Sequence, residues 1–181
     1  MKIMQNIMLD LETMGVTANS AIVSIGAVKF DLDLGIINKF YEVVDLQSCI
    51  EKGFDIDGKT VQWWLKQSED ARKEIANAKI AIPIKEALQK FKDWLGYDNI
   101  QIWGNGSDFD NTILINAFQK FKVMAPWRYT ANRCYRTLRY SFPTIEGIER
   151  VGTSHKSVDD AEYQANYLIA LVEKYKLKNV L

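Results

Sequence analysis

The sequence is poor in the residues that mark membrane, disulfide-rich or zinc-binding proteins. Its 181 residues include only two cysteines, three prolines and one histidine. No run of about 18 apolar residues is present, which excludes a transmembrane helix. The first residues lack the apolar core and cleavage site of a secretory signal. Cys49 and Cys134 have no metal-binding spacing, so we expect reduced thiols in a cytoplasmic protein.

An excess of positive charge is also missing. The chain has 23 basic and 23 acidic residues, which gives a formal net charge of zero. Proteins that coat nucleic acid without sequence preference usually carry a clear basic excess. A polyanionic substrate would therefore have to be attracted locally, by bound metal and a few arginines. This balance favours an enzyme that grips a few nucleotides over one that tracks a long duplex.

The composition is that of a globular protein, with 48% hydrophobic and 25% charged residues. The chain is long enough to bury a full core and shows neither repeats nor a linker, so we expect residues 1–181 to form a single domain. Apolar segments bounded by turn residues predict strands over 7–12, 21–30, about 36–46 and 100–103. Helical periodicity predicts helices over 60–77, 84–95, 111–121, 133–140 and 158 to about 175. This order predicts an α/β fold, a mixed β-sheet flanked by α-helices.

Two acids close the first predicted strand. Asp10 and Glu12 stand two residues apart, and such side chains point to the same side of a strand. Adjacent carboxylates repel each other, so the pair usually needs a cation, hydrogen-bond donors or full solvation. Taken alone, the two residues fit solvated charges in a turn equally well.

Further candidates for the same site come much later in the chain. Asp110 follows a glycine-containing turn, and His155, the only histidine, stands five residues before Asp160. Each has an ordinary alternative. Asp110 could cap the next helix, with Asp108 as its rival for any functional role. Ser157 and Asp160 fit a capping box, and His155 alone could be a loop residue. The combination is much rarer than its parts and points to metal-assisted hydrolysis.

That combination resembles the motifs of the DEDDh exonucleases, a group within the ribonuclease H-like superfamily. Residues 10–15, Asp-Leu-Glu-Thr-Met-Gly, resemble the first motif, Asp-x-Glu-Thr-Thr-Gly. Phe109-Asp110 resembles the end of the second motif, although residues 105–108, Asn-Gly-Ser-Asp, depart from the common His-Asn-Ala-x. Residues 155–160 match the third motif, His-x-Ala-x-x-Asp, with serine in place of alanine. Motif order and length agree over nearly the whole chain.

A finer resemblance is to a bacterial and bacteriophage branch, the Rv2179c-like 3′–5′ exoribonucleases. It rests on the first motif together with residues 21–30 and 60–67. The resemblance implies a ribonuclease H-like fold and a 3′–5′ exonuclease that releases nucleoside 5′-monophosphates. Its implied partners are the 3′ ends of single-stranded RNA or DNA, with RNA favoured, and a homodimer is plausible because many relatives pair.

The resemblance also implies the roles of the site residues. Asp10, Glu12, Asp110 and Asp160 would hold two divalent cations around the scissile phosphate, and His155 would act as the general base that deprotonates the attacking water. Ligands that are all oxygens suit Mg²⁺ or Mn²⁺.

Substrate contacts are expected from three further residues. Counterparts of Thr13 and Met14 in the family line the pocket of the terminal nucleotide. Trp63 is a candidate for base stacking, whereas Trp64 falls on the apolar face of its predicted helix and is expected in the core.

Three arginines recur every third residue, and they could either face phosphates or form a solvated helix surface: Arg133, Arg136 and Arg139. Three alternative functions stay open beside the exoribonuclease. One is an exodeoxyribonuclease, and the second is a proofreading or processing subunit that needs a partner. The third is a non-catalytic nucleotide-binding module, against which the presence of all five site residues weighs.

Overall fold

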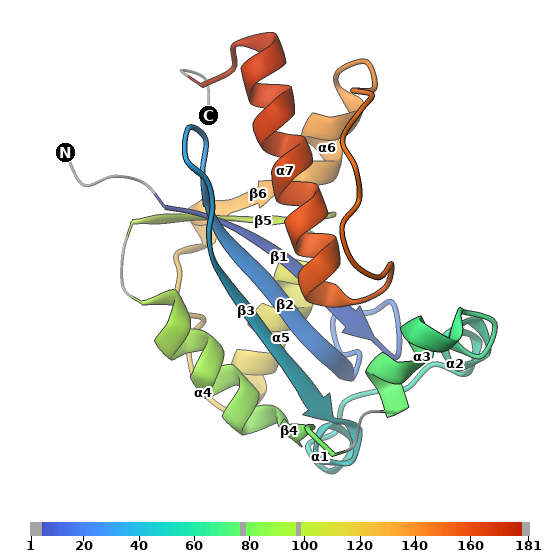
Figure 1. Ribbon diagram of the computed structural model, residues 1–181. Coiled ribbons are helices and arrows are strands. Elements are labelled where there is room, and N and C mark those ends of the chain that lie inside the picture. The colour runs from blue at the N-terminus through green and yellow to red at the C-terminus, as the bar shows by residue number, and fades with distance from the viewer. Residues whose placement is uncertain (1–4, 77–78, 97–98, 179–181) are drawn as a thin grey trace.

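The computed structural model describes residues 5–76, 79–96 and 99–178. Its centre is a six-stranded sheet in the order β4-β3-β2-β1-β5-β6 (Figure 1). Strands β1, β2 and β3 are antiparallel neighbours, while β5 runs parallel to β1, β6 to β5, and β4 to β3. The strands are β1 (Gln5–Thr13), β2 (Ile22–Asp31), β3 (Gly35–Asp45), β4 (Ile82–Pro83), β5 (Ile100–Gly104) and β6 (Asn132–Cys134).

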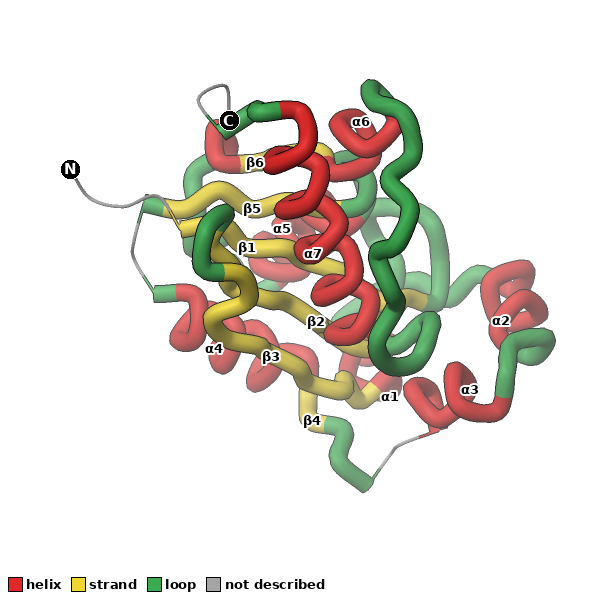
Figure 2. Tube along the Cα trace, turned by 45° about the horizontal axis from the view of Figure 1, so that its top comes forward, coloured by secondary structure: helices red, strands yellow, loops and turns green. Residues whose placement is uncertain are grey.

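Helices cover both faces of this sheet. Helix α7 crosses one face, and α4 and α5 lie against the other (Figure 2). Within the described ranges, no helix is both long and apolar enough to cross a membrane. The helices are α1 (Leu46–Glu51), α2 (Gly58–Trp64), α3 (Glu69–Ala76), α4 (Ile84–Leu95), α5 (Asp110–Lys120), α6 (Tyr135–Tyr140) and α7 (Ser157–Tyr175), with a 3-10 turn at Tyr129–Ala131.

Alternation along β1 divides the core into two parts. Ile7, Leu9 and Leu11 pack into the cluster under α4 and α5, whereas Met8 packs into the cluster under α7. Because successive side chains of a strand point to opposite faces, Asp10 lies on the same face as Met8, toward α7. The same alternation that builds the core therefore directs the acid pair of β1 to the α7 side.

The helix predicted over 60–77 is wrong as a single element. Helix α2 ends at Trp64 and α3 begins at Glu69, while residue 77 lies outside the described ranges. Ser68 explains the break, because its hydroxyl accepts a hydrogen bond from Ala71 N at 3.2 Å and so starts a new helix. Arg72 extends back and donates from Nη1 to the carbonyl oxygen of Gln67. The apolar residues keep a helical spacing across this break, so their periodicity alone predicted one continuous helix.

The helix predicted over 133–140 begins later than expected. Residues 132–134 instead pair with β5 as strand β6. Helix α6 starts at Tyr135, where the Cys134 sulfur accepts a hydrogen bond from Thr137 N at 3.4 Å. The short elements α1 and β4 were not predicted either. Helix α1 has a recognisable start, since the Asp45 carboxylate accepts from the backbone of Gln47 and Ser48.

Candidate active site

The candidate site lies where β1 and β5 separate. The two strands pair only as far as Leu9 and Gly104, after which β1 continues without a strand on that side. Leu11 N instead donates a hydrogen bond of 3.1 Å to Oδ1 of Asp110, at the start of α5. The Asp110 carboxylate thus accepts the hydrogen bond that a neighbouring strand would otherwise accept. Ligand sites of open α/β sheets commonly lie at the carboxyl ends of strands that diverge in this way.

Asp10 lies at the centre of the acidic residues. Gln164, from α7, donates from Nε2 to Asp10 Oδ1 at 2.7 Å. Burial raises the pKa of Asp10 well above its ordinary value, and the negative charges of Asp110, Glu12 and Asp160 raise it further. The charges of the four carboxylates therefore interact, and Asp10, Glu12, Asp110 and Asp160 are called the acidic group below.

Asp110 is the acid of its segment that faces this group. Its side chain is buried, whereas that of Asp108 is exposed to solvent. Burial raises the pKa of Asp110 to about 7, although the hydrogen bond from Leu11 N acts in the opposite direction. Its second oxygen, Oδ2, is buried and has no hydrogen-bond partner among the described residues. The helix-cap alternative does not hold, because the residue at the cap position of α5 is Phe109.

The start of α7 rests directly on β2 beside Asp10. Gly26 pairs with Asp10 in the sheet, and a Cβ atom on Gly26 would lie 2.1 Å from the carbonyl carbon of Ser157. The hydroxyls of Ser24 and Ser157 also form a hydrogen bond of 2.8 Å. The capping box does not form, because Ser157 uses its side chain to hold α7 on the sheet and the cap position belongs to Lys156.

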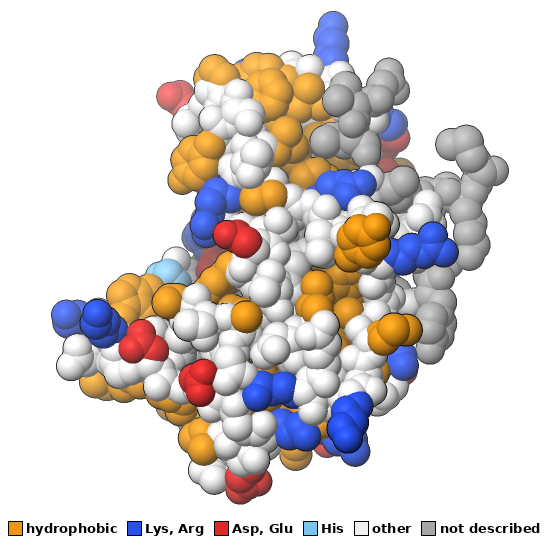
Figure 3. Space-filling model, turned by 180° about the vertical axis from the view of Figure 1, so that it is seen from behind, with side chains coloured by type: hydrophobic (Ala, Val, Ile, Leu, Met, Phe, Trp, Pro, Cys, Tyr) orange, Lys and Arg blue, Asp and Glu red, His pale blue; other side chains and the backbone are white. Residues whose placement is uncertain are grey.

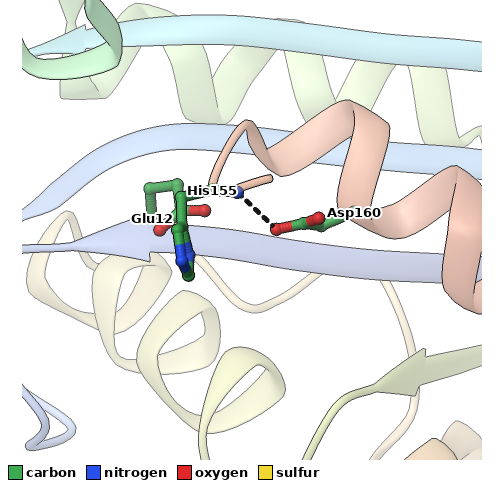
Figure 4. Close-up of side chains that lie close together, drawn as sticks. All are labelled: Glu12, His155 and Asp160. Atoms are coloured by element: carbon green, nitrogen blue, oxygen red, sulfur yellow. Dashed lines mark hydrogen bonds between the residues drawn. The ribbon is translucent and has the colours of Figure 1, made fainter. Parts of the chain in front are cut away.

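His155 stands next to Glu12 and Asp160 (Figure 4). Each of these three side chains offers a potential ligand atom, and the three atoms lie within 4.8 Å of one another. The backbone of His155 is in the left-handed region, with φ of 64°, and its amide donates to Asp160 Oδ2 at 3.0 Å. This turn directs the imidazole toward β1 and fixes Asp160 at the same time.

Aromatic rings border the histidine. The ring of Trp63 meets that of His155 edge to face, with 4.9 Å between the centroids, and Trp63 is 42% exposed. Trp64 is buried and donates from Nε1 to the carbonyl oxygen of Thr13 at 3.0 Å. Thr13 and Met14 are themselves buried, so they offer little side-chain surface beside the acids.

The surroundings of the site form a hollow on one face of the molecule. In the view from behind, the chain's one histidine lies at the base of this hollow, between the projecting α2–α3 region and the main body (Figure 3). Lysine and arginine side chains lie on the body above it.

The three regularly spaced arginines do not act together. Arg136 is the one near the acids, since its charge lowers the pKa of Asp110. Arg139 stacks on the ring of Tyr167 at 4.4 Å, and Arg133 donates to the carbonyl oxygens of residues 130 and 132. The three arginines therefore form neither a common phosphate-binding face nor a simple solvated face.

Three residues that the sequence did not single out contribute to the site. Gln164 stands four residues, about one helical turn, after Asp160, a spacing that could have indicated it. Gly26 interrupts an apolar strand, which often marks the close approach of another backbone. Arg150 forms an ion pair with Asp160 Oδ1, and nothing in the sequence pattern pointed to it.

The arrangement fits divalent cations. Four carboxylates at the end of one sheet strand and the starts of two helices supply oxygen ligands, which Mg²⁺ and Mn²⁺ prefer. The unpartnered Asp110 oxygen and the raised pKa of Asp10 both show negative charge that the described side chains do not balance. A cation would satisfy both.

Several solved structures have a similar fold. The nuclease domain of 3′hExo, a DEDDh family member bound to rAMP, is 13% identical with a TM-score of 0.63, over 94% of this chain and 92% of that one. Exonuclease I of E. coli in complex with a dA16 oligonucleotide is 14% identical with a TM-score of 0.66, over 98% of this chain but 43% of that one. Pop2p of S. pombe, in a form with Mg²⁺ and Mn²⁺ bound, is 14% identical with a TM-score of 0.64, over 94% and 84%. The predicted ribonuclease H-like α/β fold is thus confirmed.

The model of the 3′-5′ exoribonuclease Rv2179c-like domain matches residues 5–172. The chain belongs to this family of exonucleases, as its motifs had indicated. A curated relative, an exodeoxyribonuclease of Enterobacteria phage T4, is 32% identical over 127 residues, which cover 62% of this chain and 55% of the relative. The match thus spans about half the length of that phage protein.

Proposed function

We propose that this chain is a 3′–5′ exonuclease that removes nucleoside 5′-monophosphates from single-stranded nucleic acid. The observation that carries the proposal is the convergence of Asp10, Glu12, Asp110 and Asp160 at one strand end, with His155 against two of them. Family membership supports the reaction class and favours RNA as the substrate. DNA is the second candidate, because the phage relative is named an exodeoxyribonuclease.

The carboxylates are proposed to hold two cations, Mg²⁺ or Mn²⁺. Such a pair stabilises the attacking and leaving oxygens of the phosphate. The protein's contribution is to hold the acids in place, and the contacts of three of them are visible. Asp10 is held by Gln164, Asp110 by Leu11 N, and Asp160 by the backbone of His155. Asp110 also keeps Oδ2 without a hydrogen-bond partner among the described residues, so this oxygen is available to a cation.

His155 is proposed to accept the proton of the attacking water. Its ring lies beside Glu12 and Asp160, so it faces the region in which the phosphate would be held. Histidine ordinarily titrates near neutral pH, which suits a general base. Trp63 supports the ring from one side and has enough exposed surface to stack on a base. Thr13 and Met14 are proposed to border the terminal nucleotide through their few exposed atoms.

The test uses single-stranded RNA and DNA of equal sequence, labelled at the 5′ end, with Mg²⁺, Mn²⁺ or EDTA. We expect shortening from the 3′ end that requires metal and is lost in Asp10→Ala. His155→Ala should retain Mn²⁺ and nucleoside monophosphate binding but lose most turnover. Asp110→Asn and Asp108→Asn form a matched pair, because each removes one charge from the same segment. Only the first should abolish activity.

The same experiment separates the alternative functions. A higher rate on DNA than on RNA would make the chain an exodeoxyribonuclease. No shortening of either strand, with metal and mononucleotide still bound, would contradict the proposal. It would favour a partner-dependent subunit or a non-catalytic binding module instead.

A further inference from the structure

Both carboxylate oxygens of Asp160 have partners from the segment before α7. Oδ1 forms an ion pair with Nη1 of Arg150, and Oδ2 accepts the hydrogen bond from His155 N. The Asp160 side chain is only 12% exposed, while that of Arg150 is 36% exposed. The guanidinium is therefore the more solvent-exposed member of the ion pair.

The position of Arg150 disfavours a cation on the same oxygen. A Mg²⁺–oxygen bond is about 2.1 Å long and a charge-assisted hydrogen bond about 2.8 Å. An ion and a guanidinium sharing Oδ1 would thus be at most about 5 Å apart. Repulsion between a double and a single positive charge at that separation is strong in a partly buried site. The cation and the guanidinium should therefore weaken each other's binding at Oδ1.

The surroundings of Arg150 allow it to move. The guanidinium carbon also lies 4.6 Å from the centre of the Tyr163 ring, a favourable contact that does not depend on the ion pair with Asp160. The segment is tied to α7 on either side of Arg150, by Ile145 N to the Tyr167 hydroxyl and by Thr153 N to Asp159 Oδ2. Figure 1 shows this segment running beside α7. Arg150 can thus exchange partners while the segment stays in place.

We infer that Arg150 is a counter-ion that competes with the divalent cation for Asp160. It pairs with the carboxylate in the metal-free protein and withdraws when the cation binds. The inference rests on the proposed function, because Asp160 is a metal ligand only if that proposal holds. The alternative to competition is a positioning role, in which Arg150 stays paired with Asp160 and orients the carboxylate for the cation. The two roles predict changes of opposite sign when Arg150 is removed.

The experiment measures Mn²⁺ affinity without nucleic acid, from the paramagnetic resonance signal of the free ion. Arg150→Gln should bind Mn²⁺ about fivefold more tightly than the wild type, the effect of removing one partly buried ion pair. Arg128→Gln is the matched control, because it removes an equal charge from an exposed position that has no contact with the four acids among the described residues. Its effect should be less than twofold. Arg150→Lys keeps the charge and should stay close to the wild type.

Thermal unfolding gives a second readout that does not depend on catalysis. In EDTA, Arg150→Gln should unfold at a lower temperature than the wild type, because the ion pair is lost. With saturating Mn²⁺ the two should unfold together, because the wild-type pair is then already broken. Unchanged or weaker Mn²⁺ binding by Arg150→Gln, or a deficit that persists in Mn²⁺, would overturn the inference alone. Failure of the wild-type protein to bind Mn²⁺ would overturn the proposed function as well.

Discussion

The contact between Gly26 and the start of α7 allows the effect of one methyl group to be worked out. In Gly26→Ala the new Cβ would lie 2.1 Å from the carbonyl carbon of Ser157 and 2.2 Å from Val158 N. An ordinary contact is at least 3.4 Å. Both atoms belong to the backbone, so no side chain can rotate out of the way. The first turn of α7 must therefore move away from the sheet by about 1 Å or more.

Such a shift separates the two halves of the site. His155 and Asp160 flank the displaced turn, whereas Asp10 pairs with Gly26 and stays on the sheet. A misplacement of about 1 Å can cost on the order of 100-fold in rate. Overpacking of this kind typically costs about 1–3 kcal/mol of stability. We therefore expect Gly26→Ala to remain folded but to lose about 100-fold in kcat on single-stranded RNA, measured beside urea unfolding.

Gly58→Ala is the matched control, because nothing lies within 4 Å of a Cβ at that position. It should leave both rate and stability close to those of the wild type. If Gly26→Ala keeps a kcat within about twofold of this control, the idea that a backbone contact sets the site geometry is refuted.

Three further predictions concern the groups around the acids. Because burial raises the pKa of Asp110 to about 7, its protonated form stabilises the metal-free fold at low pH, and that contribution is lost as the pH rises from about 4 through 7. The free energy of unfolding, measured with urea in EDTA, should fall by up to about 4 kcal/mol over this pH range, and Asp110→Asn should make the fall smaller. An equal dependence on pH in the variant would count against this role of Asp110. Gln164→Leu removes the donor to Asp10 and should weaken Mn²⁺ binding about tenfold, whereas Gln89→Leu, on the exposed surface of α4, should not. Trp63→Leu should raise KM for a short oligonucleotide about tenfold, and an unchanged KM would exclude base stacking.

Local patterns in the sequence were sufficient for much of the fold. The alternation in β1 depends only on neighbouring residues, so it indicated both the strand and the shared side of Asp10 and Glu12. Helix α4 extends from Ile84 to Leu95, as its apolar spacing predicted. The break between α2 and α3 was not predicted, because the spacing of apolar residues carries no information about a serine that caps a new helix.

The features that escaped prediction at the site depend on contacts between distant segments. Strand β6 exists because β5 is beside it, and its three residues are too few to show a period. The ion pair of Arg150 with Asp160 depends on how the segment before α7 folds back, which no local pattern encodes. The family motifs indicated five candidate site residues, but the groups that contact them became visible only in three dimensions.

The hydrogen bond from Leu11 N to Asp110 makes one backbone proton a natural probe of the site. Most amides of a central strand face a neutral carbonyl, and their resonances respond little to charge. This amide faces a carboxylate that changes its protonation near neutral pH and that is proposed to receive a cation. Its magnetic resonance frequency and its exchange with solvent should therefore follow the state of Asp110. The Leu11 amide proton in β1 can therefore report the state of the site, and no label has to be introduced where a substrate would lie.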